Sequence, residues 1–102
     1  MSTPTRAKHL SRRLADLRSV GPATLHDLER LGIHTIGALA TQEPATLYQR
    51  LCEVTGRRHD PCAQDVLACA IAQARRPDLP MEQRDWWYWS RRRKAGLLEI
   101  PQ

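Results

Sequence analysis

The segment from Leu14 to Leu39 most constrains the fold, because its leucines follow helical spacing and are interrupted at two short breaks. The first break runs from Arg18 to Pro22, and the second is the pair Gly32-Ile33. A proline suits the first turn of a helix, where its missing N–H would have no partner anyway, and a glycine suits the left-handed residue that ends a helix. The segment therefore predicts two short helices joined by a tight turn, which is the outline of a helix-hairpin-helix.

Apolar spacing and capping residues predict helices along the rest of the chain, and no window shows the sustained alternation of a strand. In the first half of the chain, the expected inner faces are Leu10, Leu14 and Leu17 on a helix ending near Arg18; Leu25, Leu28 and Leu31 on a helix starting at Pro22; and Ile36 and Leu39 on a short helix capped by Thr35. In the second half, they are Leu47, Leu51 and Val54 on residues 44–56; Val66, Leu67, Ala70, Ile71 and Ala74 on residues 61–76, capped by Asp60; and Trp86 and Trp89 on residues 81–95. The expected fold is all-α: a compact bundle of five to six short helices that contains a helix-hairpin-helix, with a SAM-like core.

Length and composition favour one globular domain. The chain has 102 residues, 41% of them hydrophobic, which is enough for one core and too few for a second. We expect a frayed arm over residues 1–9, a single helical domain over 10–95 and a tail over 96–102. No run approaches the roughly 18 apolar residues of a membrane span, and the polar, basic start of the chain does not form a signal sequence. A cytoplasmic protein without membrane contact is the expectation.

Positive charge gathers at the two ends of the chain, whose formal net charge is +5. Residues 1–20 and residues 84–94 each carry five cations against one carboxylate, whereas residues 21–83 carry six arginines against eight carboxylates. If the two ends fold to one side, they form a single basic face that attracts polyanions such as nucleic acid. Basic ends that are merely solvated are the alternative.

The turn of the hairpin is the main candidate binding site. Its exposed main-chain donors would be the N–H groups of Ser19, Gly21, Ala23 and Thr24, at the start of a helix whose dipole favours anions. Gly21 suits a positive φ or a close approach of another backbone, and Val20 would pin the turn to the core. Such donors contact phosphates and read no bases, so the expected activity is sequence-independent binding to the DNA backbone. An ordinary tight turn between two helices is the alternative.

A run of aromatic and basic residues follows near the end of the chain. On a helix, Trp86 and Trp89 share one face and Trp87 points about 100° away, so the three indoles cannot be equally buried. We expect Trp86 and Trp89 to close the core, and Trp87 or Tyr88 to form an exposed platform. The cations from Arg91 to Lys94 follow one turn later, a combination that suits single strands or unpaired bases.

Metal binding and catalysis are weaker interpretations. Cys52, His59, Cys62 and Cys69 supply four nitrogen or sulfur ligands, but their spacing fits no tight zinc module, and three cysteines argue against a disulfide framework. Small buried hydrophobes are the simpler interpretation of the cysteines. The sequence shows no carboxylate pair, nucleophile with a nearby base, or phosphate-binding glycine loop, so we expect no enzyme activity, no metal and no cofactor.

The order of these features resembles a known family. The residues that carry the likeness are Leu14, Leu17, Val20-Gly21-Pro22, Leu28, Gly32-Ile33, Leu39, Leu47-Tyr48, Leu51-Cys52, Gly56, Asp60-Pro61-Cys62 and the run from Trp86 to Arg91. They are similar to the small bacterial helix-hairpin-helix proteins of the pathogenicity locus family, some of which are labelled mitomycin-resistance proteins, from Leu10 to Lys94. The resemblance implies a compact all-α fold, a DNA-binding role and no established enzymatic activity. The stretch from Ile33 to Leu39 also resembles the C-terminal domain of the RNA polymerase alpha subunit, which supports the helical core.

Three residues depart from the general hairpin pattern. Binding hairpins commonly have a glycine where Ser19 stands and a lysine or arginine where Ala23 stands. The turn is therefore less permissive, and Arg13 or Arg18 would have to supply the missing cation. Leu25 stands where a small alanine often lets the two helices approach each other.

The sequence thus predicts a DNA-binding protein, with a protein-interaction adaptor as the alternative. The residues expected to contact nucleic acid are Arg13, Arg18, Ser19, Val20, Gly21, Ala23, Thr24, Arg91, Arg92, Arg93 and Lys94. Duplex, single-stranded and junction DNA, RNA, and any oligomeric state all remain open at this point.

Overall fold

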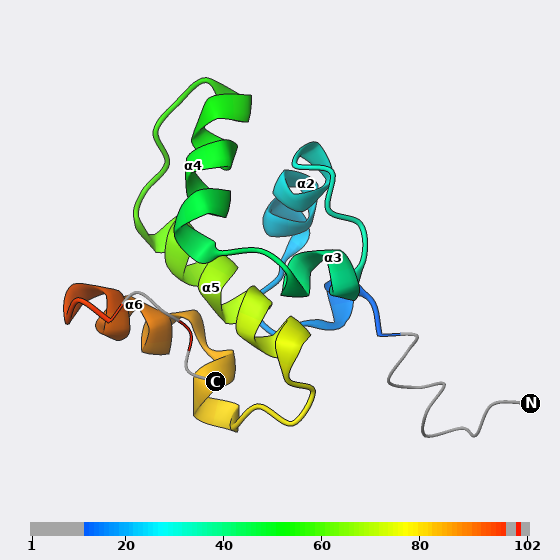
Figure 1. The fold of residues 1–102 in the computed structure, drawn as a ribbon, viewed down its shortest axis with the longest axis vertical. Coiled ribbons are helices and arrows are strands. Elements are labelled where there is room, and N and C mark those ends of the chain that lie inside the picture. The colour runs from blue at the N-terminus through cyan, green and yellow to red at the C-terminus, as the bar shows by residue number, and fades with distance from the viewer. Residues whose placement is uncertain (1–11, 98–99, 101–102) are drawn as a thin grey trace, which may run out of the picture.

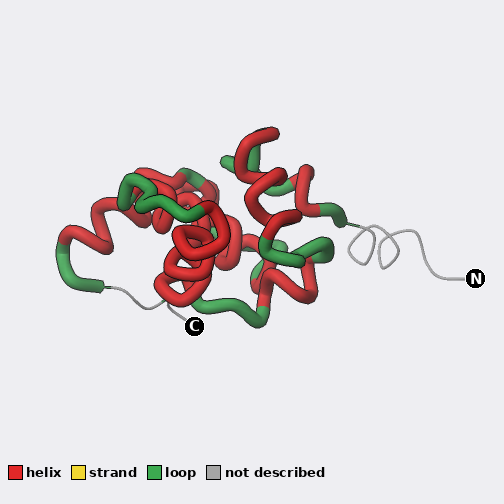
Figure 2. Tube along the Cα trace, turned by 90° about the horizontal axis from the view of Figure 1, so that it is seen from above, coloured by secondary structure: helices red, strands yellow, loops and turns green. Residues whose placement is uncertain are grey.

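Residues 12–97 and Ile100 are described by the computed structural model, and all regular structure among them is helical (Figure 1, Figure 2). The elements in chain order are the 3₁₀ turn η1 (Leu14–Asp16), the helices α2 (Pro22–Arg30), α3 (Ile36–Ala40), α4 (Pro44–Thr55) and α5 (Cys62–Arg75), the 3₁₀ turn η2 (Met81–Arg84) and the helix α6 (Trp86–Lys94). The expected all-α fold is confirmed. The predicted arm over residues 1–9, and with it Leu10, lies outside the described residues. Within the predicted tail, Ile100 is half-buried against the core.

Helix α5 is the central element, and it is buried on two sides. It packs against α3, α4, η2 and α6, and Figure 1 shows it crossing the middle of the molecule. One side, with Leu67 and Ile71, joins a core made largely by leucines of α2, α3 and α4. The other side, with Cys69, packs against Leu79 and Trp89. The alanines of α5 have small side chains, which lets neighbouring helices pack closely on both sides.

Helix α2 ends as its sequence predicts. Gly32 has a φ of 78°, and the N–H of Ile33 donates to the carbonyl of Leu28 at 2.9 Å. This hydrogen bond turns Ile33 back onto the core, where it is buried. Gly56 ends α4 in the same left-handed conformation, with a φ of 71°. Both predicted helix ends are therefore confirmed.

Thr35 caps the start of α3 as predicted, whereas Asp60 stands one residue before the N-cap of α5, which is Pro61. The hydroxyl of Thr35 accepts a hydrogen bond from the N–H of Ala38 at 3.1 Å, at the start of α3. A carboxylate oxygen of Asp60 accepts a hydrogen bond from the N–H of Cys62 at 2.8 Å, at the start of α5. Because that hydrogen bond favours the ionised carboxylate, it holds the pKa of Asp60 below its usual value.

Only part of the first expected helix forms within the described residues. One 3₁₀ turn, Leu14–Asp16, is followed by extended backbone at Leu17. Leu14 and Leu17 are buried as predicted. The extended backbone carries Arg18 to α5, where its peptide groups bond to Gln73. This tertiary contact overrides the helical spacing of the leucines, and the complete helix-hairpin-helix is not confirmed.

The last expected helix is interrupted, and the interruption changes the burial of its aromatic residues. The chain forms η2, becomes extended at Asp85 and only then enters α6. Trp89 is 4% exposed, and its indole N–H donates to the carbonyl of Gln83 at 2.8 Å, so it closes the core as predicted. Trp86 is 40% exposed, because it begins α6 directly after the break, and its predicted place in the core is wrong. Val54 is also exposed rather than buried, in the last turn of α4, which extends past the neighbouring helices (Figure 1).

Candidate nucleic-acid interface

The turn before α2 is set by the backbone conformation of Ser19. Ser19 has a φ of 74°, in the left-handed region that residues other than glycine seldom adopt. Gly21 has a φ of −88°, and a Cβ added there would meet no atom within 4 Å. The expectation that Gly21 supplies a positive φ or a close approach is therefore wrong, and Ser19 makes the bend instead. The general hairpin pattern indicates this position, because glycine is common there.

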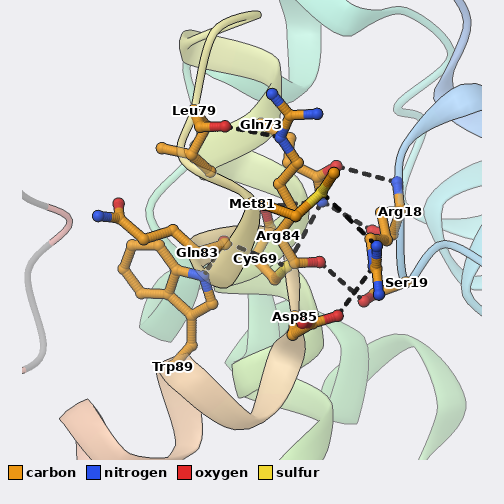
Figure 3. Close-up of polar contacts among 10 residues, drawn as sticks. All are labelled: Arg18, Ser19, Cys69, Gln73, Leu79, Met81, Gln83, Arg84, Asp85 and Trp89. Atoms are coloured by element: carbon orange, nitrogen blue, oxygen red, sulfur yellow. Dashed lines mark hydrogen bonds and ion pairs between the residues drawn. The ribbon is translucent and has the colours of Figure 1, made fainter.

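Two side-chain contacts hold this conformation (Figure 3). The side-chain amide of Gln73, on α5, accepts a hydrogen bond from the N–H of Arg18 at 2.9 Å and donates one to the carbonyl of Arg18 at 2.7 Å. The hydroxyl of Ser19 donates to the carbonyl of Arg84 at 3.2 Å, at the end of η2. Because Gln73 is buried, the turn is bonded directly to the centre of the molecule. These bonds offset part of the free-energy cost of the left-handed residue.

The start of α2 presents four main-chain donors. Among the described residues, the N–H groups of Ser19, Gly21, Ala23 and Thr24 have no hydrogen-bond acceptor, and Gly21 and Ala23 are exposed to solvent. The N–H of Val20 bonds within the turn, and its side chain packs half-buried against the core as expected. Three of these donors, Gly21, Ala23 and Thr24, lie at the positive end of a nine-residue helix, which favours an anion at this position, and Ser19 lies in the turn before it.

The cations that flank the turn in sequence are partly neutralised. The guanidinium of Arg18 donates to a carboxylate oxygen of Asp85 at 2.9 Å, although 54% of the Arg18 side chain stays exposed. It also lies 3.7 Å from the sulfur of Met81. Arg13 lies 3.9 Å from Asp16 in an exposed pair of the kind that contributes little to stability. Both arginine side chains therefore remain accessible to solvent.

Two of the four cations at the end of α6 are held by the core. Arg93 donates to both carboxylate oxygens of Asp65, at 2.9 and 3.1 Å, and the Asp65 side chain is only 2% exposed. The hydrogen bonds from this pair raise the pKa of Arg93. Arg92 is half-buried, and its guanidinium lies 5.7 Å from the ring centre of Trp89. Arg93 and Arg92 are thus engaged in packing the helix onto the molecule.

The other two cations of this run face solvent. The guanidinium of Arg91 lies 4.4 Å from the ring centre of Trp87, in a cation–π contact. Trp87 is 45% exposed, and Lys94 is exposed as well. Of the two residues predicted to be exposed, Trp87 or Tyr88, Trp87 is the exposed one and Tyr88 is half-buried.

The two groups of predicted binding residues lie near opposite ends of α6. Arg18 and Ser19 contact Asp85 and Arg84, directly before the helix starts. The cations of the last turn lie at the far end of a nine-residue helix, about 13 Å in length. Figure 1 shows α6 running away from α2. The structure thus joins the turn to the start of α6 and leaves the last-turn cations one helix length away.

Sequence reasoning missed the residues that hold both groups in place. Gln73 and Asp65 are 5% and 1% exposed in a helix that is otherwise rich in alanine. A buried polar side chain requires a partner, and their partners are Arg18 and Arg93. A polar residue at an inner position of an apolar helix is therefore the signal that could have found them. Asp85 carries no such signal, because an aspartate before a helix is commonly a simple cap.

The cysteines and the histidine of the metal alternative do not form a ligand set. Within the described parts of the chain, no group of three or more His, Cys, Asp or Glu side chains is placed to hold a metal ion. Burial raises the pKa of the Cys69 thiol to about 11. A hydrogen bond with Asp60 raises the pKa of the Cys62 thiol. His59 bonds instead to the hydroxyl of Thr55, at 2.7 Å.

Taken together, the fold and the site define a small all-helical protein with an exposed turn before α2 and a solvent-facing aromatic and cationic surface on α6. The chain belongs to the Pathogenicity locus family, whose profile matches residues 7–95, and the resemblance seen in the sequence is confirmed. It is similar to the mitomycin resistance protein McrB of Streptomyces lavendulae, with 37% identity over 84 residues that cover 82% of this chain and 76% of that protein. No solved structure matches the chain. No helix among the described residues is long and apolar enough to cross a membrane.

Proposed function

We propose that this protein binds DNA through the phosphate backbone and without reading base sequence. The observation that carries the proposal is the start of α2 together with the turn before it, where four N–H groups have no acceptor among the described residues. Phosphate oxygens are well suited to such donors, because each oxygen accepts hydrogen bonds and carries negative charge at the positive end of the helix dipole. Contacts of this kind position a protein on nucleic acid without distinguishing bases.

The electrostatics of the site favour a polyanion. The first turn of α2 contains no carboxylate, Arg18 is half-exposed beside it, and the chain carries a net charge of +5. The start of α2 can be compared with the start of α4, because both helices begin with the same four residue types, Pro-Ala-Thr-Leu. The residue before α4 is Glu43, whereas the residue before α2 is Gly21. The start of α2 is therefore the better anion site of the two.

A salt titration tests the proposal directly. The affinity for a labelled duplex, measured by fluorescence anisotropy, should fall steeply as salt rises. The log–log slope should be roughly −4 to −6 for about five to seven contacted phosphates. Failure to bind any duplex at low salt would remove the proposal.

A matched pair of variants locates the contact. Ala23→Glu places a carboxylate among the α2 donors, and Ala45→Glu places the same charge at the equivalent position of α4; both alanines are exposed. We expect Ala23→Glu to weaken duplex binding about tenfold and Ala45→Glu to have much less effect. Glutamate in a first helical turn is stabilising, so unfolding is not a source of the loss. Equal losses in both variants would mean that only net charge matters and that the turn is not the site.

A protein-interaction adaptor is the second candidate function. It is favoured by the exposure of two large neighbouring side chains, Trp86 at 40% and Trp87 at 45%. Exposed aromatic residues of this kind are enriched in protein interfaces. A complex with a protein partner that survives both nuclease and high salt, and that is lost in Trp87→Ala, would favour this function over DNA binding.

A further inference from the structure

We propose that the face of α6 made by Trp87, Arg91 and Lys94 stacks unpaired nucleobases, so that the protein prefers single-stranded DNA to duplex. This inference rests on the proposed function, because it assumes that the start of α2 binds the phosphate backbone. It assigns to α6 a separate task, which is contact with the bases themselves.

The three residues share one outward face of α6. They are spaced four and then three residues apart, which places their side chains one above the other along a helix. The helix buries a different face, with Trp89 and Ser90 in the core. Trp87, Arg91 and Lys94 are all exposed to solvent. Apart from the contact between Arg91 and Trp87, the side chains of this face therefore have no partner among the described residues.

That internal contact makes a layered surface suited to bases. The guanidinium of Arg91 lies 4.4 Å from the ring centre of Trp87. Unpaired bases stack both on aromatic rings and on guanidinium planes, and this stacking does not depend on base identity. Lys94 adds a mobile positive charge one turn further on, where it can contact a phosphate of the same strand. The face thus offers stacking and charge together.

Two other charges of this region are already engaged. Arg93 is bonded to the buried Asp65, and Asp85, before the helix, is bonded to Arg18. The nine residues of α6 include no carboxylate. A polyanion approaching this face therefore meets Arg91 and Lys94 without an opposing charge from the helix. Charge complementarity favours a nucleic acid strand as the occupant over an apolar protein surface.

The turn before α2 is bonded to the chain directly before α6. Ser19 and Arg18 contact the two residues that precede α6, and Trp87 is its second residue. The turn that leads into α2 is therefore joined to the chain next to the aromatic end of α6. Bases inside a duplex are already stacked and cannot reach an exposed indole, whereas bases of a single strand can.

The experiment compares three DNA probes of about 12 nucleotides, which lies within the roughly 4–16 nucleotide range of single-strand sites. They are an oligo-dT strand, an abasic strand of equal length that keeps the phosphates and lacks bases, and a duplex. We expect the parent protein to bind oligo-dT about tenfold more tightly than the abasic strand, as expected for one stacked base. It should also bind oligo-dT more tightly than the duplex.

Substitutions then assign the preference to this face. Trp87→Leu should abolish the preference for oligo-dT over the abasic strand and leave the salt slope unchanged, whereas Trp87→Phe should keep part of the preference. Trp86→Leu is the matched control, because Trp86 is similarly exposed and is not stacked by Arg91. Unchanged thermal midpoints would show that the variants are folded. Equal losses in Trp86→Leu and Trp87→Leu would overturn the assignment.

The two proposals fail in different ways. If the protein binds all three probes with equal affinity, the stacking inference is wrong and backbone binding stands. If it binds none of them at low salt, both proposals are wrong, and contact with a protein partner then explains the exposed tryptophans. If Trp87→Leu keeps the full preference for oligo-dT, the bases are read elsewhere and the inference is again wrong.

Discussion

The side-chain amide of Gln73 forms hydrogen bonds with both peptide groups of Arg18, accepting from its N–H at 2.9 Å and donating to its carbonyl at 2.7 Å. Gln73 is 5% exposed and lies in the last turn of α5. Through this pair of bonds, the central helix fixes the path of the chain directly before the turn that leads into α2. The turn that carries the exposed donors is therefore bonded directly to a buried residue of the core.

The first prediction follows from this pair of bonds. Gln73→Met keeps the volume of the side chain but leaves both peptide groups of Arg18 without their partner. Gln73 is buried but Arg18 is not, so each lost hydrogen bond costs about 0.5–1.5 kcal/mol, and we expect the free energy of unfolding to fall by about 1–3 kcal/mol. Urea denaturation measures the loss as a lower midpoint at unchanged slope. Gln64→Met, on the same helix, should change stability by less than about 0.5 kcal/mol, and equal losses in the two variants would contradict the assignment.

A second prediction concerns the left-handed residue of the turn. Ser19→Ala and Ser19→Gly both remove the hydroxyl that donates to Arg84, but only glycine adopts a φ of 74° without strain. We therefore expect the glycine variant to be more stable than the alanine variant by about 1 kcal/mol. Thermal unfolding of the two variants side by side measures this difference. Identical midpoints would indicate that the backbone at Ser19 is relaxed.

The helices that the sequence predicts correctly are those whose ends are specified locally. The left-handed Gly32, the capping Thr35 and the carboxylate of Asp60, which bonds to the first residue of α5, act within a few residues of their own positions. Local signals of this kind are readable without knowledge of the fold. The apolar faces of α2 and α5 follow from spacing alone, because each helix is long enough to show its period.

Local patterns do not predict the turn before α2 or the break at the start of α6. Ser19 takes its conformation with the help of Gln73 and Arg84, which lie more than fifty residues away in the sequence. The break at Asp85, which exposes Trp86, is likewise held by Arg18 from the other end of the chain. Long-range hydrogen bonds and ion pairs override helical spacing at these two places, and both belong to the candidate site.

A third prediction concerns stability at high pH. Burial raises the pKa of Cys69 to about 11, above the value of about 8.5 expected in the unfolded chain. As pH rises, the unfolded state therefore loses this proton first. The stability contributed by the protonated thiol is complete below about pH 8.5 and is lost as pH rises towards 11. Cys69→Ala should weaken the alkaline fall in the thermal midpoint, and an unchanged fall would show that the thiol is not responsible.

The thiol chemistry of the same residue gives a fourth prediction. The thiolate is the form that reacts with alkylating agents, so a buried thiol with a raised pKa should be nearly inert near neutral pH. We expect iodoacetamide to label the half-buried Cys52 much faster than Cys69 in the folded protein. Peptide mapping by mass spectrometry measures the two rates. Denaturant should bring them together, and comparable rates in the folded protein would contradict the burial of Cys69.

The final prediction separates two arginines that the sequence presents as equivalent. Arg93→Ala leaves the buried carboxylate of Asp65 unpaired, and we expect it to lower the free energy of unfolding by about 3 kcal/mol. Arg91→Ala removes a solvent-facing side chain and should change stability by less than about 0.5 kcal/mol.

On our proposal, Arg91→Ala weakens binding to oligo-dT, whereas folded Arg93→Ala binds nearly as well as the parent. Urea denaturation and anisotropy on the same two proteins test both halves. A simultaneous change of Arg91, Arg92 and Arg93 would mix the two effects, so the single variants are required. A loss of binding without a loss of stability in Arg93→Ala would contradict its role as the partner of Asp65.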